Sequence, residues 1–311
     1  MTDHTQIKTP VLIAGDSKLV SSVAVCLILA IQPVVILTQH ILEMVESLNN
    51  HAKDINTFSE FPLNMNLVSI INTLDNKTDY LLAIALTNES LPEKLEMISL
   101  METVISSDKT IAINTESISL TNIQKAAKFP ERIFGTNWVE PAHTTYFLEI
   151  ISNKKNDQQL LKDFADHAKL YWKKDPYIIN SDHSIRARLM CAMIREAFYL
   201  VENGYVTFED IDRACRNDAG YYLPFAGNFR YMDLMGTYIY GIVMKDMNPD
   251  LTRQQHVPAF FKYIVQQGWL GMDNNHGFYE YPEGEAEKWN TLSRNFSYQI
   301  RDIINKYHTV I

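Results

Sequence analysis

Positive charge is scarce in this chain. Its 311 residues include 28 Lys and Arg against 37 Asp and Glu, so the formal net charge is −9 at pH 7. A broad nucleic-acid-binding face needs an excess of cationic side chains to neutralise phosphates. The composition therefore argues against a nucleic-acid partner, although it leaves room for a local cationic pocket that binds one phosphorylated ligand.

Cysteine is rare as well. Cys26, Cys191 and Cys215 are the only three, they lie far apart, and no C-x-x-C spacing occurs. This pattern argues against a disulfide framework and against a cysteine-based metal site. It predicts reduced, mostly buried thiols in a cytoplasmic protein, with no metal expected.

Long uninterrupted apolar runs are missing too. Residues 1–9 are polar, which predicts no secretory leader. The most apolar stretch, residues 20–37, is interrupted by Ser21, Gln32 and Pro33, and the proline would break a helix. We therefore expect a buried helix followed by a buried strand, and no membrane partner.

The apolar residues that are present alternate between strand and helix patterns in the first half of the chain. Residues 11–14 and 34–37 are short apolar runs that predict buried parallel strands, and residues 18–31 between them predict a helix. Strand, helix and strand in this order make a βαβ unit. Further strands are expected at 67–71, 80–85, 110–113 and twice within 132–151, with a helix at 92–105.

Beyond residue 156 the pattern becomes helical. Apolar spacing predicts helices at 158–172, 182–203, 231–244 and 258–267. Thr207 is expected to cap another helix, with Asp210 at its third position. The predicted fold class is therefore α/β plus all-α, with a Rossmann-like, doubly wound nucleotide-binding domain over residues 1–178 and an all-α domain over residues 179–311.

Two adjoining segments carry a family resemblance. Residues 135–141 and 146–150 resemble the part of the L-3-hydroxyacyl-CoA dehydrogenase family that holds the catalytic histidine, in the pattern G-x-H-F-F-N-P, and the glutamate that orients it. Other matches follow the family's order, at residues 128–135, 210–214, 228–236 and 268–281. The resemblance implies NAD-linked oxidation of a 3-hydroxyacyl-CoA, as in fatty acid metabolism. It also implies a helical domain like that of 6-phosphogluconate dehydrogenase, which binds substrate and forms a homodimer.

The dinucleotide fingerprint is incomplete. A G-x-G-x-x-G turn would place its glycines at Gly15, Ser17 and Val20, and only the first is kept. The acidic residue that holds the ribose at the end of the second strand is replaced by Thr38. These changes favour a scaffold that binds no dinucleotide. The alternative is an altered site for NAD or NADP, with Gly15, Ser17, Thr38 and Asn114 as cofactor-binding candidates.

The family's reacting residues are mostly replaced. Carried over residue by residue, its histidine falls on Asn137 and its glutamate on Glu149. The serine that bonds the reacting oxygen falls on Glu116, and an asparagine that does the same falls on Ala187. An amide cannot accept a proton near neutral pH, so the acid/base step has lost its carrier. This predicts impaired standard catalysis, as in a pseudoenzyme.

The replacements also gather negative charge. Glu116, Glu140 and Glu149 have no evident cation in the sequence, which suggests a cationic ligand, a metal or an abandoned site. His183 is expected one helical turn from Ala187 on the same face, where Glu116 or Glu149 could orient it as a relocated base. His143 is a second candidate base.

Three hypotheses about function therefore stay open. The chain is a diverged family member kept for binding, assembly or another reaction; it is an active NAD(P)-dependent oxidoreductase with a relocated base such as His183, acting on an acyl-CoA-like substrate; or it is a different enzyme, metal-assisted or lyase-like, in the same cleft.

Overall fold

Two compact units make up the chain, Met1–Ala187 and Arg188–Ile311. The computed structural model describes residues 9–58, 62–75 and 77–307. Every strand of the described sheet belongs to the first unit, and the second is helical. The predicted fold class is confirmed.

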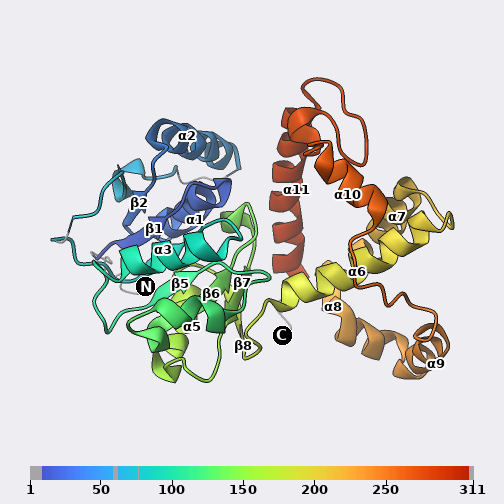
Figure 1. Ribbon diagram of the computed structural model, residues 1–311. Helices are drawn as coiled ribbons and strands as arrows, with labels where there is room; N and C mark the ends of the chain where they lie inside the picture. Colours follow the sequence, from blue (N-terminus) through green and yellow to red (C-terminus); the bar gives the residue numbers. More distant parts are fainter. Residues whose placement is uncertain (1–8, 59–61, 76, 308–311) are drawn as a thin grey trace. The chain divides into compact units, whose positions relative to one another are not determined.

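The first unit contains an eight-stranded sheet in the part of the chain that is described (Figure 1). The strand order is β3-β2-β1-β4-β5-β6-β7-β8, and neighbours run parallel except for the antiparallel pair β6 and β7. The strands are β1 (Val11–Ala14), β2 (Val34–Leu37), β3 (Val68–Ile71), β4 (Ala83–Ala85), β5 (Ile111–Ile113), β6 (Ile133–Asn137), β7 (Phe147–Ile151) and β8 (Asp175–Ile179).

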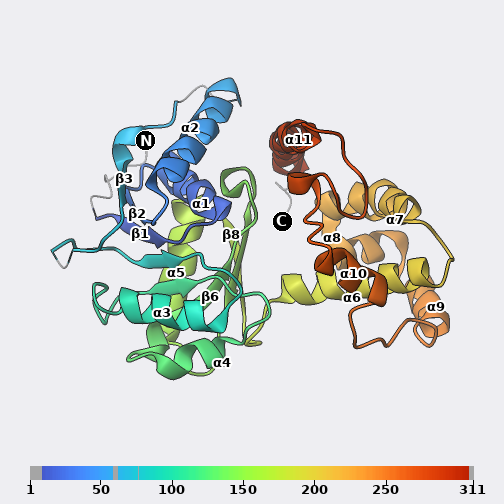
Figure 2. The same cartoon turned by 45° about the horizontal axis from the view of Figure 1, so that its top comes forward.

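Helices cover both faces of the sheet because successive strand residues point to opposite sides. Val11 and Ile13 belong to the core beneath one group of helices, whereas Leu12 and Ala14 belong to the core beneath the other. The first group is α1 (Lys18–Leu29), α2 (Ile41–Phe58) and α5 (Gln158–Leu170), and the second is α3 (Leu91–Met101) and α4 (Leu120–Ile123), as Figure 2 shows. The apolar stretch at residues 20–37 is thus a buried helix and a strand, as predicted.

Strand order reverses at β1 and β4, which lie side by side. In doubly wound sheets, ligands bind outside the carboxyl ends of the strands at this switch point. Gly15, Thr38, Leu86 and Asn114 each follow a strand directly, at the ends of β1, β2, β4 and β5 respectively. The fold therefore brings the loops of the predicted nucleotide site to one edge of the sheet.

Strand β8 was not predicted from the sequence. Pro176 lies within it, and proline is excluded from central strands because it cannot donate to the ladder. The strand is tolerated because β8 stands at the end of the sheet and pairs with β7 alone. Its residues occupy the segment where the sequence indicated only a passage from sheet to helix.

The second unit continues from α6 (Ile185–Glu202), which begins in the first unit. The other helices described there are α7 (Phe208–Ala214), α8 (Gly220–Met235), α9 (Thr237–Met247), α10 (Ala259–Gln266) and α11 (Glu285–Tyr307). The Thr207 cap is confirmed, since Thr207 and Asp210 form a reciprocal capping box. The single helix expected at 231–244 is wrong, because Gly236, at φ +99°, separates α8 from α9.

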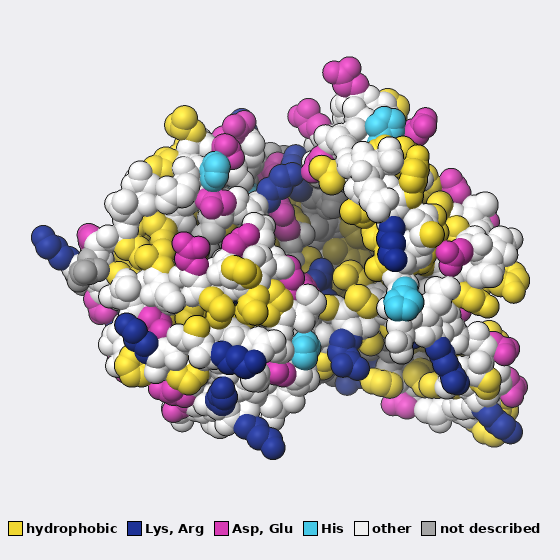
Figure 3. Space-filling model, viewed as in Figure 1, with side chains coloured by type: hydrophobic (Ala, Val, Ile, Leu, Met, Phe, Trp, Pro, Cys, Tyr) yellow, Lys and Arg dark blue, Asp and Glu magenta, His cyan; other side chains and the backbone are white. Residues whose placement is uncertain are grey.

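Apolar side chains remain exposed over much of the second unit, where the space-filling view shows many of them at the surface (Figure 3). Among its described residues only Thr252 and Tyr298 are buried. The expectation of mostly buried thiols is also corrected here, because Cys191 and Cys215 are exposed and only Cys26 is buried. No helix among the described residues is long and apolar enough to cross a membrane.

Candidate active site

The turn after β1 opens the candidate dinucleotide site. Gly15 has a φ of +142°, and a Cβ there would lie 2.1 Å from the carbonyl oxygen of Leu86. This position therefore requires glycine. Val20, at the third glycine position of the fingerprint, is fully buried in the core between α1 and the sheet, so its branched side chain is accommodated.

The amino end of α1 can receive an anion. The helix begins at Lys18, so the N–H groups of its first turn have no carbonyl partner within the helix and carry partial positive charge. Ser17 is exposed, and in this described turn its hydroxyl makes no capping hydrogen bond. These donors fit the pyrophosphate of a dinucleotide, although Ser17 stands where the family has its second glycine.

A carboxylate that the sequence analysis missed lies at the end of β2. Thr38 is buried, and its hydroxyl donates to Oδ1 of Asp16 at 2.5 Å. The N–H of Gln39 donates to the same oxygen at 3.1 Å. Asp16 precedes Thr38 by 22 residues and comes from the β1 turn, so no pattern around Thr38 itself could reveal it.

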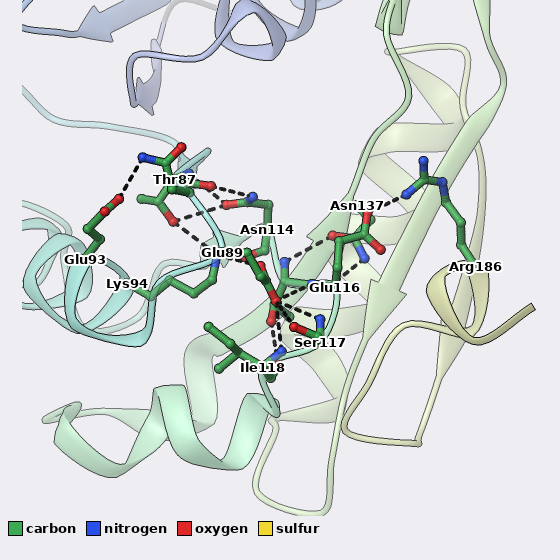
Figure 4. Close-up of polar contacts among 12 residues, drawn as sticks. Thr87, Glu89, Glu93, Lys94, Asn114, Glu116, Ser117, Ile118, Asn137 and Arg186 are labelled. Carbon is green, nitrogen blue, oxygen red and sulfur yellow. Dashed lines mark hydrogen bonds and ion pairs between the residues drawn. The ribbon is translucent and has the colours of Figure 1, made fainter. Parts of the chain in front are cut away.

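Asn114 joins the ends of β4 and β5 (Figure 4). Its Oδ1 accepts a hydrogen bond from the N–H of Thr87 at 2.8 Å, and its Nδ2 donates to the carbonyl of Thr87 at 2.8 Å. The side-chain amide thus adds a rung to the β ladder. Asn114, a predicted cofactor-binding residue, therefore fixes the loop after β4 against the loop after β5.

A buried lysine reinforces the same junction. The Lys94 ammonium is fully buried, donates to the carbonyl of Asn114 at 2.7 Å and to the Thr87 hydroxyl at 3.2 Å, and lies 3.2 Å from Oε2 of Glu89. Burial lowers the pKa of Lys94, and the Glu89 charge opposes that shift. The ammonium stays buried because all three neighbours are acceptors.

Glu89 also fills a ring of main-chain donors after β5. Its Oε1 accepts hydrogen bonds from the N–H groups of Glu116, Ser117 and Ile118 at 3.0, 2.7 and 2.8 Å (Figure 4). Although burial raises it, the pKa of Glu89 lies below its ordinary value because these N–H groups and the Lys94 charge favour the carboxylate. Glu89 therefore sets the shape of the loop that carries Glu116.

Asn137 is tied into the sheet. It is almost fully buried and lies directly opposite Glu149 across the β6–β7 pair. Its Nδ2 donates to the carbonyl of Thr115 at 2.8 Å and to Oε2 of Glu149 at 2.9 Å, and its Oδ1 accepts from the N–H of Thr115 at 3.1 Å. Both donor positions of the amide are thus used by the protein.

Glu149 is equally occupied. Its Oε1 accepts hydrogen bonds from the N–H groups of Ile185 and Arg186, at 2.9 and 3.1 Å, and from the Tyr177 hydroxyl at 3.1 Å. The carboxylate therefore caps the amino end of α6, where negative charge is stabilised by the helix dipole. Burial and the Glu149 charge raise the pKa of Tyr177, so that hydroxyl remains a donor.

The expectation that the carboxylates lack a cation is wrong. Arg186 forms an ion pair with Glu116, and both side chains are about one-third exposed, at 35% and 34%. Burial raises the pKa of Glu116; Arg186 lowers it, whereas Glu149 and Glu89 raise it further. Arg186 lies outside the positions at which the family has reacting residues, so the resemblance gave no signal for it.

His183 does not lie where the sequence analysis expected it. Helix α6 begins at Ile185, and the Ser184 hydroxyl caps it by accepting from the N–H of Ala187 at 2.9 Å. His183 therefore precedes the cap and shares no helical face with Ala187. Both oxygens of Glu149 are engaged by other groups, and within the described chain neither Glu149 nor Glu116 hydrogen-bonds the His183 imidazole.

The second candidate base and the metal hypothesis find no support in this geometry. His143 lies in a short 3-10 turn and packs edge-to-face against His51, with 5.5 Å between ring centroids. Within the described residues there is no group of three His, Cys, Asp or Glu side chains that could hold a metal ion. Glu116, by contrast, combines partial exposure with a pKa that burial raises.

Comparisons with known proteins agree with this architecture. The family model "3-hydroxyacyl-CoA dehydrogenase, NAD binding domain" matches residues 35–182. The model "3-hydroxyacyl-CoA dehydrogenase, C-terminal domain" matches residues 185–281. The first match begins after the β1 turn, so the altered glycine fingerprint lies outside it.

Individual relatives are distant in sequence. A 5-formyl-3-hydroxy-2-methylpyridine 4-carboxylate 5-dehydrogenase from Mesorhizobium japonicum is 26% identical over 220 residues, covering 69% of this chain and 71% of that protein. A probable 3-hydroxybutyryl-CoA dehydrogenase from Bacillus subtilis is 24% identical over 220 residues, covering 70% and 76% respectively.

Solved structures show the same fold. A crystal structure of a 5-formyl-3-hydroxy-2-methylpyridine 4-carboxylic acid 5-dehydrogenase, described as an NAD+-dependent dismutase, superposes with a TM-score of 0.88 at 21% identity, covering 96% of this chain and 99% of that one. An (S)-3-hydroxybutyryl-CoA dehydrogenase from Ralstonia eutropha gives a TM-score of 0.70 at 20% identity, covering 89% and 100%. Because the two family models together span most of residues 35 to 281, this chain belongs to the 3-hydroxyacyl-CoA dehydrogenase family.

Proposed function

We propose that this chain is a diverged 3-hydroxyacyl-CoA dehydrogenase family protein that binds NAD and has lost the family's standard proton transfer. One observation carries the proposal: the two positions that correspond to the catalytic pair, Asn137 and Glu149, are hydrogen-bonded to each other and to the main chain. The pair has become a brace between β5, β6, β7 and the start of α6.

The brace cannot replace a histidine. Asn137 has no basic nitrogen, and both of its N–H donors already have acceptors. Glu149 already accepts four hydrogen bonds, and none of these four comes from a histidine. Losing general-base catalysis costs about 10²- to 10⁴-fold in rate, so standard turnover should be strongly reduced.

The first unit nevertheless fits a dinucleotide. Gly15 and the open amino end of α1 would hold the pyrophosphate, with the Ser17 hydroxyl as a further donor. When bound, NAD would accept a hydride from an alcohol or aldehyde substrate. The match to the family's NAD-binding domain over residues 35–182 and the close approach of Gly15 to Leu86 support a retained site over an empty scaffold.

Binding and turnover measurements test the proposal together. Titration calorimetry should detect NAD binding, and thermal unfolding should shift upward by several degrees at 100-fold excess over Kd, which corresponds to about 2.7 kcal/mol. NADH formation from 3-hydroxybutyryl-CoA should be slower than in histidine-bearing relatives by about 10²-fold or more. Turnover equal to that of those relatives, or no binding of any dinucleotide, would overturn the proposal.

A double substitution asks whether the cleft still accepts the family's substrate. Asn137→His with Ala187→Asn restores the two replaced side chains while Glu149 remains. Increased NADH formation from 3-hydroxybutyryl-CoA would mean that only the proton carrier was lost. No increase, with NAD binding intact, would place the divergence in substrate recognition as well.

A second candidate function is an active NAD(P)-linked oxidoreductase with another base. The favouring observation is Glu116, whose pKa is raised by burial and which stands where the family's serine bonds the reacting oxygen. A carboxyl group with a raised pKa suits general acid/base work near neutral pH. Its partner Arg186 could bind a carboxylate, a group that the substrate named for the Mesorhizobium relative carries.

Two substitutions separate the candidate bases of this second function. If Glu116 exchanges the proton, Glu116→Gln should abolish turnover with pyridine-carboxylate aldehydes and leave NAD binding unchanged. If His183 exchanges it, His183→Ala should do so instead. Full activity in both variants would remove both groups from consideration.

The helical unit supports a homodimer as the proposed partner arrangement. Its described residues bury almost no side chain, whereas apolar residues such as Tyr221, Phe229 and Tyr238 are more than 80% exposed, at 84%, 83% and 81%. Apolar surface on this scale is typical of a protein interface. We also propose an acyl-CoA-like ligand for this chain, and that part of the proposal rests on the family resemblance alone.

A further inference from the structure

The carboxylate of Asp16 occupies the position where dinucleotide-binding folds recognise the adenosine ribose. Such folds place an acidic side chain at the end of the second strand, where it accepts hydrogen bonds from the ribose hydroxyls. In this chain the strand ends with Thr38, which has no carboxylate. Asp16 reaches the same place from the β1 turn and bonds to both Thr38 and Gln39.

The Asp16 carboxylate is held in a fixed position. Oδ1 accepts from the Thr38 hydroxyl at 2.5 Å and from the Gln39 N–H at 3.1 Å. The Thr38 hydroxyl oxygen accepts in turn from the N–H of His40 at 3.0 Å, which orients its own hydrogen towards Asp16. Thr38 is buried, with 2% of its surface exposed, so the anchor itself does not move freely.

One oxygen of this carboxylate remains available. Asp16 is an exposed residue, and within the described chain its hydrogen bonds all go to Oδ1. A carboxylate oxygen has two lone pairs and can accept hydroxyl donors. Oδ2 can therefore receive a ribose hydroxyl without breaking either anchoring bond.

The charges around this position favour an unphosphorylated ribose. His40 lies 3.5 Å from Glu43, so its charge, when present, is already opposed by a neighbouring carboxylate. Lys18 is the nearby cation in the sequence, but it stands at the start of α1, where the pyrophosphate would lie. A 2′-phosphate would meet the Asp16 charge directly and be repelled.

We propose that Asp16 is the ribose-binding residue of this chain and makes its dinucleotide site selective for NAD over NADP. The acid that the family pattern places at the end of β2 is supplied here from the turn that follows β1. This inference rests on the proposed function, because it presupposes that the first unit binds a dinucleotide.

The test is a set of binding titrations on the full chain, with calorimetry as readout. NAD, NADP, ADP-ribose and 2′-phospho-ADP-ribose serve as ligands. The unaltered chain should bind NAD and ADP-ribose at least tenfold more tightly than their phosphorylated counterparts. Asp16→Asn should weaken NAD binding about tenfold, as expected for a hydrogen bond to a charged group, and should narrow the preference over NADP.

A matched control separates the hydrogen bond from general charge. Glu43→Gln removes one negative charge from the same exposed edge of the fold; within the described residues Glu43 pairs with His40 and makes no hydrogen bond to Asp16, Thr38 or Gln39. It should leave NAD affinity unchanged within twofold. Thermal unfolding of both variants without ligand checks that the β1 turn is intact, because Asn can still accept the Thr38 hydroxyl.

The outcomes distinguish this inference from the proposed function. Binding of NAD and NADP with equal affinity, or unaltered NAD affinity in Asp16→Asn, would overturn the role of Asp16 and leave dinucleotide binding standing. Failure of all four ligands to bind the unaltered chain would overturn the proposed function and this inference with it. An equal loss of NAD affinity in Glu43→Gln would also contradict a specific role for Asp16.

Discussion

At the scale of single residues, the side chain at position 137 decides whether the site has a proton acceptor or a structural hydrogen bond. Where the family has an imidazole, Asn137 offers two N–H donors and an oxygen, and each is used by Thr115 or Glu149. An amide fits between two main-chain groups as a ladder rung does, which an imidazole cannot. The same replacement therefore removes a base and adds a structural bond.

Asn137→Leu should destabilise the first unit. It keeps a similar volume but leaves the Thr115 N–H and carbonyl and one Glu149 oxygen without partners. Unsatisfied buried groups cost about 1–3 kcal/mol each, so for these three groups we expect a loss of about 3 kcal/mol or more in urea unfolding. Asn122→Leu, which removes a side-chain bond to exposed Lys125, should cost less than about 0.5 kcal/mol. Equal losses in the two variants would contradict the structural role of Asn137.

Gly15→Ala should be more severe still. The new Cβ would meet the Leu86 carbonyl at 2.1 Å, and φ of +142° is strained for any residue with a side chain. We expect a loss of more than about 3 kcal/mol or failure to fold. Gly204→Ala is the control, because Gly204 also has positive φ, at +72°, but a Cβ there meets nothing within 4 Å. It should cost about 1 kcal/mol, measured by the same unfolding curves; similar costs in both would contradict the close approach of β1 and β4.

At the scale of elements, loops from neighbouring strands hold one another in place. The loop after β4 provides Glu89 and receives the ammonium of Lys94, and the loop after β5 provides three N–H donors. The local sequence of neither loop determines its conformation. Their mutual contacts position Glu116 and, through Thr115, the Asn137 side chain.

Glu89→Gln should weaken this junction in a pH-dependent way. The variant leaves Lys94 buried without its counter-charge, and since Glu89 is about one-third exposed (31%) we expect a loss of only about 1–3 kcal/mol at pH 7. The folded pKa of Glu89 lies below its unfolded value of about 4.3. Its contribution is therefore present above pH of about 4.3 and is lost as the pH falls through the folded pKa.

Urea unfolding of both proteins at several pH values between about 7 and 3 measures this difference. The gap in stability between the unaltered chain and Glu89→Gln should shrink towards the acid end. Glu93→Gln, in the first turn of α3, alters an exposed carboxylate that accepts a hydrogen bond from the Asn88 side chain, and it should show a small and nearly constant difference in stability. If the difference in unfolding free energy between the unaltered chain and Glu89→Gln grew on acidification, the proposed role of the Glu89 carboxylate would be contradicted.

At the scale of the whole molecule, the two units differ in how well they bury apolar surface. The first has two continuous cores on the faces of its sheet. The second leaves large apolar residues exposed along most of its described helices. Because burial of apolar surface is the main favourable term in folding, we expect this unit to gain stability when a second copy covers these side chains.

Light scattering coupled to size exclusion should therefore give about twice the chain mass of 35.8 kDa. Phe229→Glu, at a position 83% exposed in α8, should shift the protein towards monomer, because a charge would be buried at the contact. Leu42→Glu, at a position 84% exposed on α2 of the first unit, should leave the mass unchanged. A monomer in the unaltered protein would remove the homodimer proposal.

Much of the fold could be predicted from local patterns. Strands β1 and β2 were predicted to the residue, because four consecutive apolar residues bounded by turn signals have few alternatives. Helix α11 was not, since its acidic first turn hid an apolar row that includes Leu292, Phe296 and Ile303. The break at Gly236 was missed because apolar spacing continues on both sides of it.

The sequence by itself determined which chemistry this chain has lost. Asn137 has no basic nitrogen in any conformation, and Ser17 and Val20 carry side chains where the dinucleotide fingerprint has glycine. Only the tertiary structure decided what took the place of the lost groups. Asp16 reaches the end of β2, Arg186 neutralises Glu116, and Glu149 caps α6. These contacts join segments 22 to 70 residues apart, and a short polar side chain finds a distant partner only when the backbone has fixed both ends.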